Sequence, residues 1–392
     1  MESTGKSSNV ARGATRLGII GGGQLAKMTA LSALQLGCDV IVLERKPDSP
    51  AARLATHSIV GDWNDPAQLL ELATQVDVVS IENEFLDTKA LAILESSGHK
   101  LFPRTATLSL IQDKFIQKKT LAKAGLPVPP FAAVANQIEL LQQAAKFGWP
   151  LVLKTRRNGY DGKGNFTLRS EADIPRAWET LGGGRNELYV EAFCPFEREL
   201  AIIITRSADG RVAEYPVAET VQRDHICHLV TAPANISPEI AKRAAESGRH
   251  AIEAIGGIGS FGVEMFLTVN GEILVNELAP RVHNSGHYTI EACVCSQFEN
   301  HARAVLGWPL GSTEMCAPAA AMVNLLGATD GPGDPLGLDN ALAVAGAHVH
   351  IYGKAHSARG RKMGHVTALG ITAAEAIATA ERAAQKIMFG KP

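Results

Sequence analysis

The sequence of 392 residues lacks the hydrophobic segments of a membrane or secreted protein. No apolar run approaches the roughly 18 residues of a membrane-spanning helix, and residues 1–15 contain no apolar core of a signal peptide. The six cysteines have no CxxC or other zinc-ligand spacing, which is typical of reduced thiols in a reducing compartment. We therefore predict a cytoplasmic protein without membrane contact, beginning with a disordered leader over residues 1–15.

The sequence also has little net charge, with 38 basic and 40 acidic side chains. A formal charge of −2 produces no field that would attract nucleic acid or an anionic membrane surface. The apolar content of 46% is enough for large cores, and a chain of this length usually forms two or three domains. We expect a globular protein that binds small molecules and no nucleic acid.

What is present begins with a strand, a glycine turn and a helix over residues 16–28. Gly21-x-Gly23-x-x-Ala26 fits the dinucleotide-binding fingerprint, and Glu44 ends the next strand where it could bind a ribose. The same helix N-terminus could instead bind a substrate phosphate, or the turn could serve only close packing. Strands and helices alternate up to Glu82, and this predicts a parallel, doubly wound, Rossmann-like domain over residues 16–112.

A second glycine-rich stretch follows a strand that ends at Lys154. Residues 155–165 contain three glycines and Lys163 but no Walker A sequence. Backbone N–H groups and two lysines suit a flap that covers a polyphosphate. A plain surface hairpin is the alternative.

The strand over residues 188–192 is stopped by Pro195, and a buried strand begins at Glu199. Such a hinge leaves unpaired backbone groups for the edge of a purine. Glu191 and Glu199 would then contact a nucleotide amino group and ribose hydroxyls. They could also be ordinary exposed strand ends.

The most informative stretch is residues 261–289, which indicates a β-hairpin and a polar loop. Asn270-Gly271 between two apolar runs predicts a type I′ turn, in which both central residues have positive φ. Centring the register on that turn gives three predicted cross-strand pairs: Val269 with Glu272, Leu267 with Leu274, and Glu264 with Glu277.

Two carboxylates directly opposite each other repel, so Glu264 and Glu277 predict a cation between them. Mg²⁺ is held by few protein carboxylates when phosphates complete its shell, and Asn276 adds another oxygen. The alternative is a solvated edge with both glutamates in water. Residues 280–287, PRVHNSGH, follow at once and contain more polar chemistry than a solvated turn requires.

Together, the lysine-terminated strand and the strings GYDGKG, EAFCPFEREL, FGVEMF and NELAPRVHNSGHYT resemble the ATP-grasp superfamily. The last two strings resemble its N5-carboxyaminoimidazole ribonucleotide synthetase family, and the likeness runs from Gly18 to about Leu369. The resemblance implies an α/β fold, α+β in part, with a central ATP-grasp domain over residues 113–312 and a small β-rich C-terminal module over residues 313–392. It also implies ATP- and bicarbonate-dependent carboxylation of 5-aminoimidazole ribonucleotide through carboxyphosphate in purine biosynthesis, with ATP and Mg²⁺ as cofactors, by a homodimer.

The resemblance assigns site residues in four groups. ATP would be bound by Lys114, Lys154, Gly159, Tyr160, Asp161, Gly162, Lys163, Gly164, Asn165, Glu191, Ala192, Phe193, Cys194, Glu199, Gln222, Asn276 and Glu277. Mg²⁺ would be held by Glu264 and Glu277, and catalysis at bicarbonate would involve Arg281, Asn284 and His287. The ribonucleotide would contact Gln24, Leu25, Glu82, Tyr160, Lys354 and Arg361, with Arg359 as the alternative to Arg361. Asn158 and Gln222 depart from the family pattern, which usually has glycine and histidine there.

Three other interpretations fit parts of the sequence. A different ATP-grasp enzyme, such as a formate-dependent glycinamide ribonucleotide transformylase or a biotin carboxylase, would differ in the acid that stimulates ADP release. An NAD-dependent oxidoreductase would use the N-terminal glycines and Glu44. A catalytically idle nucleotide-binding subunit would bind ATP without releasing phosphate.

Overall fold

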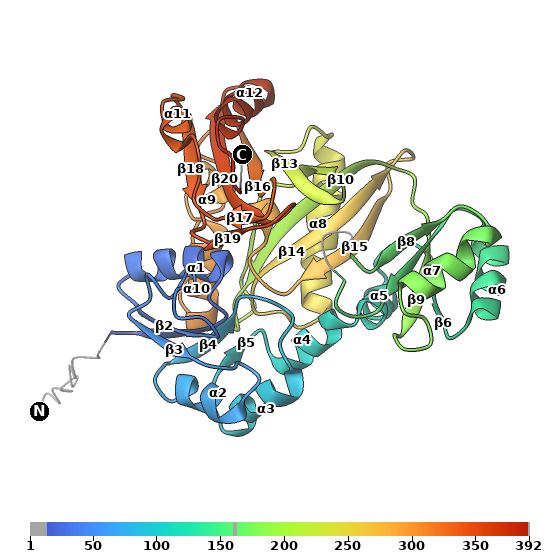
Figure 1. Ribbon diagram of the computed structural model, residues 1–392, viewed down its shortest axis with the longest axis horizontal. Coiled ribbons are helices and arrows are strands. Elements are labelled where there is room, and N and C mark those ends of the chain that lie inside the picture. Colours follow the sequence, from blue (N-terminus) through green and yellow to red (C-terminus); the bar gives the residue numbers. More distant parts are fainter. Residues whose placement is uncertain (1–13, 160–162, 391–392) are drawn as a thin grey trace, which may run out of the picture.

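The computed structural model describes residues 14–159 and 163–390 (Figure 1). Its first unit is a five-stranded parallel sheet with the strand order β3-β2-β1-β4-β5. These strands are β1 (Arg16–Ile20), β2 (Asp39–Glu44), β3 (His57–Val60), β4 (Val78–Ile81) and β5 (Leu101–Phe102). The predicted parallel N-terminal sheet is confirmed.

Helices cover both faces of this sheet, because successive strand residues point to opposite sides. Val40 and Val42 on β2 pack with α1 (Gln24–Gln35) and α10 (Gln297–Leu306). Ile41 and Leu43 pack instead with α2 (Pro66–Ala73) and α3 (Thr88–Ser96). The helix α10 comes from much later in the chain, so one face of the N-terminal sheet is covered partly by a helix of the following region. Helix α4 (Thr105–Gln112) then leads to α5 (Lys114–Lys123).

A four-stranded antiparallel sheet with the order β6-β9-β7-β8 forms a separate lobe at the right of Figure 1. Its strands are β6 (Phe131–Val134), β7 (Leu151–Thr155), β8 (Asn165–Leu168) and β9 (Leu188–Ala192). Helices α6 (Gln137–Phe147) and α7 (Ile174–Thr180) and the short turn Glu171–Asp173 complete the lobe. The strand β7 ends beside the glycine-rich stretch, as the sequence predicts.

A nine-stranded sheet forms the centre of the molecule. Its main path runs β15-β14-β10-β12-β13-β16-β20-β18, and β11 pairs with β10. Its strands are β10 (Phe196–Arg206), β11 (Val212–Glu214), β12 (Ala218–Arg223), β13 (Ile226–Ala232), β14 (Gly259–Thr268), β15 (Ile273–Ala279), β16 (Ala319–Leu326), β18 (Ala347–Ile351) and β20 (Lys362–Gly370). Helix α8 (Pro238–Ala254) packs on β10, β14 and β15.

The C-terminal region is rich in strands, and three of them extend the central sheet through the β13–β16 pair. Helix α12 (Ala373–Ala384) covers these strands. The region also contains α11 (Leu338–Leu342) and the short pair β17 (Gly331–Pro332) and β19 (His356–Ser357), while α9 (Thr289–Ala292) and the turn Asn284–Gly286 precede it. The sheet therefore continues across residue 313, the domain boundary that the sequence predicts. Among the described residues, no helix has both the length and the apolar character needed to span a membrane.

Candidate active site

The hairpin of β14 and β15 turns differently from the prediction. Gly271 N–H donates to the Thr268 carbonyl at 2.9 Å, and Thr268 N–H donates to the Glu272 carbonyl at 3.0 Å. Gly271 has a φ of 76°, and Asn270 is not among the residues with positive φ. The connection is therefore a three-residue loop with glycine in the left-handed position, a common hairpin form. The predicted type I′ turn is wrong.

The predicted pairing of the two glutamates is nevertheless confirmed. Near the turn the register differs by one residue, because Leu267 pairs with Ile273. Strand β15 then has a β-bulge: Asn276 is an extra residue opposite the step from Met265 to Glu264 on β14. Beyond this bulge, Glu264 pairs with Glu277. A bulge of one residue thus compensates the shift at the turn and brings the two carboxylates opposite each other.

The carboxylate pair has cationic and imidazole neighbours. Glu277 forms an ion pair with Lys114 at the start of α5, and His283 Nε2 lies 3.5 Å from Glu264 Oε1. Burial, then Glu277 and Glu199, raise the pKa of Glu264. No group of three or more His, Cys, Asp or Glu side chains in the described residues, this site included, is arranged to hold a metal ion by protein ligands alone. Two carboxylates that repel each other fit a magnesium ion whose remaining ligands are phosphates and waters.

A buried ion-pair network lies next to this hairpin. Glu191 on β9 is only 3% exposed; its carboxylate lies 2.8 Å from Lys154 Nζ and 3.1 Å from Lys118 Nζ. Burial favours the neutral acid, but the two lysines outweigh it and lower the pKa of Glu191 to about 2. The predicted contact of the Glu191 carboxylate with a nucleotide is therefore not what the structure presents. Lys118 was not among the predicted residues.

The hinge that follows Glu191 is better hydrogen-bonded than expected. Ala192 N–H donates to the Pro130 carbonyl at 2.9 Å, and Phe193 N–H donates to the Pro150 carbonyl at 3.3 Å. Phe193 is exposed and Cys194 is half-buried. The expectation that the hinge leaves its backbone groups unpaired is wrong for these two N–H groups.

Part of the glycine-rich stretch can be placed. Asn165 pairs with Lys154 across β7 and β8. Gly164 has a φ of 84°, and a Cβ there would lie 2.5 Å from Thr155 Oγ1, so glycine is required at this close approach. Asn158 has a φ of 64°, a conformation that asparagine tolerates better than most residues. Gly159 and Lys163 flank Tyr160, Asp161 and Gly162, which lie outside the described residues.

Glu199 and Gln222 lie together on neighbouring strands. Glu199 pairs with Thr220, and a bulge separates Val221 from Gln222. Burial raises the pKa of Glu199, against a hydrogen bond from Gln222 that lowers it. The glutamine therefore contacts the predicted nucleotide-binding carboxylate directly.

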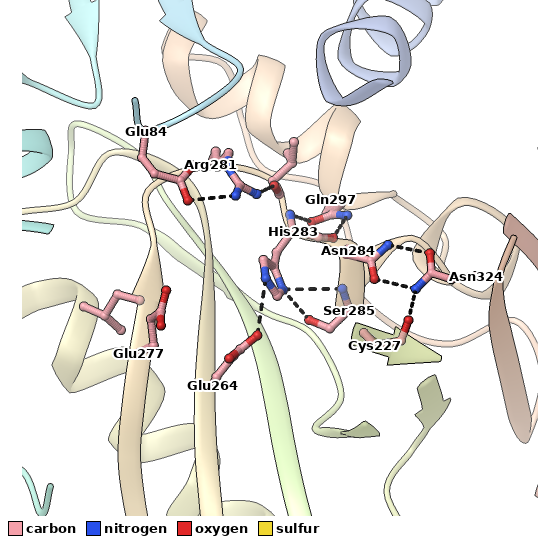
Figure 2. A network of polar contacts seen from close by, with 12 residues as sticks. Glu84, Cys227, Glu264, Glu277, Arg281, His283, Asn284, Ser285, Gln297 and Asn324 are labelled. Atoms are coloured by element: carbon pink, nitrogen blue, oxygen red, sulfur yellow. Dashed lines mark hydrogen bonds and ion pairs between the residues drawn. The ribbon is translucent and has the colours of Figure 1, made fainter. Parts of the chain in front are cut away.

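The loop over residues 280–287 connects the hairpin to the N-terminal domain (Figure 2). Arg281 binds Glu84 with two hydrogen bonds, from Nε at 2.5 Å and from Nη2 at 2.9 Å. Burial disfavours the charged carboxylate, but Arg281 outweighs it and lowers the pKa of Glu84 to about 2. Burial and the nearby Arg281 lower the pKa of His283 to about 3, so His283 is neutral at pH 7.

The two other predicted catalytic residues of this loop face the C-terminal region. The amides of Asn284 and Asn324 exchange hydrogen bonds of 2.9 Å and 2.7 Å, and Asn324 also donates to the Cys227 carbonyl (Figure 2). His287 is 0% exposed, and its ring lies 4.9 Å from that of His365 and 6.3 Å from that of Tyr352 between centroids. A side chain without exposed surface does not reach a ligand, so the predicted role of His287 at bicarbonate does not fit its position.

The N-terminal glycine turn holds carboxylates of its own chain. Gly22 N–H donates to Glu44 at 2.7 Å, and Gly23 N–H donates to Glu82 at 2.6 Å. Leu25 N–H also donates to Glu82, at 3.3 Å, while Gln24 begins α1 beside it. A Cβ on Gly23 would lie 2.1 Å from Glu82 Oε1, so a larger residue there would displace this carboxylate from its hydrogen bond with Gly23 N–H. The interpretation that these N–H groups bind a dinucleotide or substrate phosphate is wrong for this arrangement.

One basic residue of the C-terminal region, Lys354, lies near that turn. Lys354 Nζ donates to the Lys362 carbonyl at 2.6 Å, and its charge lowers the pKa of Glu82 against the larger opposing effect of burial. Lys27 Nζ on α1 donates to the Ile351 carbonyl at 2.9 Å. Arg361 is exposed and donates to the His356 carbonyl at 2.6 Å. The structure therefore brings Lys354 close to Glu82.

Family patterns match three consecutive parts of the chain. A ribonucleotide synthetase preATP-grasp domain matches residues 14–112, an ATP-grasp domain matches residues 119–298, and a phosphoribosylaminoimidazole carboxylase C-terminal domain matches residues 320–379. The solved N5-carboxyaminoimidazole synthase of Aspergillus clavatus, in complex with ADP and 5-aminoimidazole ribonucleotide, is 38% identical with a TM-score of 0.87. That match covers 95% of this chain and 98% of the other.

Two curated relatives differ in length. The phosphoribosylaminoimidazole carboxylase of Ogataea methanolica is 42% identical over 89% of this chain, which spans only 65% of that protein. The N5-carboxyaminoimidazole ribonucleotide synthase of Synechococcus elongatus is 42% identical over 90% of this chain and 88% of its own length. The chain therefore belongs to the N5-carboxyaminoimidazole ribonucleotide synthase family of ATP-grasp proteins.

Proposed function

We propose that this protein carboxylates 5-aminoimidazole ribonucleotide to N5-carboxyaminoimidazole ribonucleotide, using ATP and bicarbonate and releasing ADP and phosphate. The observation that carries the proposal is the convergence of the Glu264–Glu277 pair, the lysines at positions 114 and 154, and Arg281. Paired carboxylates and cations suit phosphoryl transfer, which depends on positioning and charge neutralisation more than on covalent help from the protein.

The proposed nucleotide-binding residues come from helix α5, the four-stranded sheet and the nine-stranded sheet. Lys114 and Lys154 would bind the polyphosphate, with residues 159–165 covering it. The backbone of residues 191–194 would contact the purine, and Glu199 with Gln222 the ribose. Glu264, Glu277 and Asn276 would hold Mg²⁺, which supplies positive charge to the phosphate oxygens when it is bound.

In the proposed reaction, a bicarbonate oxygen attacks the γ-phosphorus, the bond to the β-phosphate bridging oxygen breaks, and ADP leaves. Carboxyphosphate then delivers its carboxyl group to the exocyclic amine of the ribonucleotide as phosphate departs and the amine loses a proton. Arg281 would orient bicarbonate, because a guanidinium forms two parallel hydrogen bonds with a planar carboxylate. Its Nε and one N–H of Nη2 are paired with Glu84, and one N–H of Nη1 donates to the Val282 carbonyl, so bicarbonate would be bound by the remaining N–H groups of Nη1 and Nη2.

The ribonucleotide would lie between the N-terminal turn and the C-terminal region. Glu82, Gln24, Leu25 and Tyr160 are the proposed contacts of its base and ribose, and Lys354 with Arg361 those of its 5′-phosphate. The charge of Lys354 near Glu82 supports this placement. We retain the domain boundaries at residues 112 and 312, the cytoplasmic location and a homodimer as further parts of the proposal.

The test is phosphate release from ATP with bicarbonate, measured with and without 5-aminoimidazole ribonucleotide. We expect release that depends on bicarbonate and is stimulated by the ribonucleotide, with the carboxylated product trapped from ¹⁴C-bicarbonate. Release stimulated by formate instead of bicarbonate would contradict the proposal, as would ATP binding without any turnover. Sedimentation of the same preparation measures whether the protein is a dimer.

A further inference from the structure

Lys118 is the most completely buried basic side chain in the ion-pair network beside the hairpin. It lies one turn after Lys114 on α5, so both lysines point to the same side of the helix. Its side chain is 2% exposed, and its ammonium group lies 3.1 Å from Glu191 and donates to the Asn276 carbonyl at 3.0 Å. Lysine is almost never buried to this degree without paired charges. A lysine with so little exposed surface does not contribute to solubility, so its buried contacts point to another role.

The charges around Lys118 do not cancel. Glu191 supplies one negative charge to two lysines, and Lys154 is the more exposed of the two, at 17%. One positive charge thus remains at the open end of the network. Without Lys118, the single carboxylate would neutralise Lys154 and hold its ammonium group inside the protein.

We propose that Lys118 is a positioning residue that neutralises Glu191, so that the charge of Lys154 stays available to the polyphosphate of ATP. Lys118 does not touch the nucleotide itself, because it has almost no exposed surface. Its hydrogen bond to the Asn276 carbonyl fixes the ammonium group next to the bulge of β15. This inference rests on the proposed function, since it assigns a role within ATP binding.

The first test replaces Lys118 by methionine, which has similar length and no charge. Lys118→Met is expected to raise the KM for ATP by roughly 10- to 100-fold, the range for a lost interaction with a charged group. The KM for 5-aminoimidazole ribonucleotide should stay within about 3-fold of wild type, less than the effect of one ordinary hydrogen bond. Lys119→Met, at the neighbouring exposed position, is the matched control and should leave both values unchanged.

The second test is rescue by removal of the opposing charge. In Lys118→Met/Glu191→Gln no carboxylate remains to neutralise Lys154, so ATP binding should recover most of the loss. A residue that only packs the core would show no such recovery, because the double variant disturbs the same packing further. Thermal unfolding of each variant measures any loss of stability separately from the kinetic constants.

The outcomes distinguish this inference from the proposed function. If the wild-type protein releases no phosphate with ATP and bicarbonate, the proposed function is wrong. If the wild type is active and folded Lys118→Met binds ATP normally, loses both substrates equally, or is not rescued by Glu191→Gln, the role of Lys118 is wrong. Should the single variant not fold, the double variant decides: an ATP KM near wild type supports the inference, and a large increase overturns it.

Discussion

The two sides of the residue 280–287 loop use different physical means. On the phosphate side, formed by Lys114, Lys118, Lys154 and Glu191, full charges are paired at short distance. On the amide side, formed by Asn284, Asn324, His287 and His365, the contacts are neutral amides and rings. Charges that are buried cost desolvation energy, so they are retained where a ligand can use them. Neutral amides fix geometry at a smaller cost, which suits a loop whose position must be held.

Removing a metal ligand should produce the largest effect on the phosphate side. Glu277→Gln relieves the repulsion with Glu264, which offsets the lost ion pair with Lys114, so we expect the fold to be kept. The substitution also removes a charge from the proposed Mg²⁺ site. A bound metal contributes several kcal/mol of charge stabilisation, so turnover should fall by at least roughly 100-fold. The rate of phosphate release at saturating Mg²⁺ measures this fall in turnover, with Glu272→Gln on the same hairpin as control. Full activity of Glu277→Gln would show that Mg²⁺ is not held at Glu277.

Lys154 allows a narrower test on the phosphate side. Lys154→Ala should raise the KM for ATP by roughly 10- to 100-fold, since a charge-assisted contact is lost. The KM for the ribonucleotide should change little, because Lys354 and Arg361 belong to a different part of the site. Lys146→Ala, exposed on the same lobe, is the control. Equal losses for both substrates would indicate misfolding rather than a lost phosphate contact.

The Arg281–Glu84 pair, which holds the loop to the N-terminal domain, predicts a pH dependence of stability. The pKa of Glu84 in the folded protein, about 2, lies below that of an ordinary glutamic acid. A lowered pKa stabilises the folded state above the unfolded value and loses this contribution as pH falls toward 2. Glu84→Gln should therefore cost on the order of 3 kcal/mol at pH 7, and the difference from wild type should shrink below about pH 4.5. Urea unfolding between pH 7 and pH 3 measures it, and a difference independent of pH would contradict the ion-pair explanation.

The sequence predicts the strand and helix alternation of the N-terminal domain because that pattern is local and periodic. It also predicts the Glu264–Glu277 pair. The turn shifts the strand register by one residue from the prediction, and the bulge shifts it back by one residue. A bulge has no sequence signature of its own here, so the register near Leu267 could not be derived. The pairing of β13 with β16 is a tertiary choice between strands far apart in the chain, and local patterns do not specify it.

Buried partners were the main omission among the site residues. Lys118 looks like an ordinary helix-surface lysine, since its burial depends on Glu191, which lies far along the chain. Its position one turn after Lys114 was the only local signal. Asn324 has even less signal, because it lies within an apolar strand and its partner Asn284 is 40 residues away. For the same reason, the structure alone reveals that His287 faces the C-terminal region.

The smallest expected effect is on the amide side. Asn324→Ala would leave both polar atoms of the Asn284 amide and the Cys227 carbonyl without their present partners. An unsatisfied buried polar group costs about 1–3 kcal/mol, so the free energy of unfolding should fall by about that amount. Because no charge is lost, the KM for ATP should stay the same, while a less well held loop should raise the bicarbonate requirement. Urea unfolding and bicarbonate titration measure the two effects, and Asn340→Ala at an exposed helical position is the control.

A normal bicarbonate requirement in a destabilised Asn324→Ala protein would mean that the amide pair supports the fold without positioning Arg281. A changed ATP KM would show that the two sides of the loop are coupled, and the contrast between them would then fail.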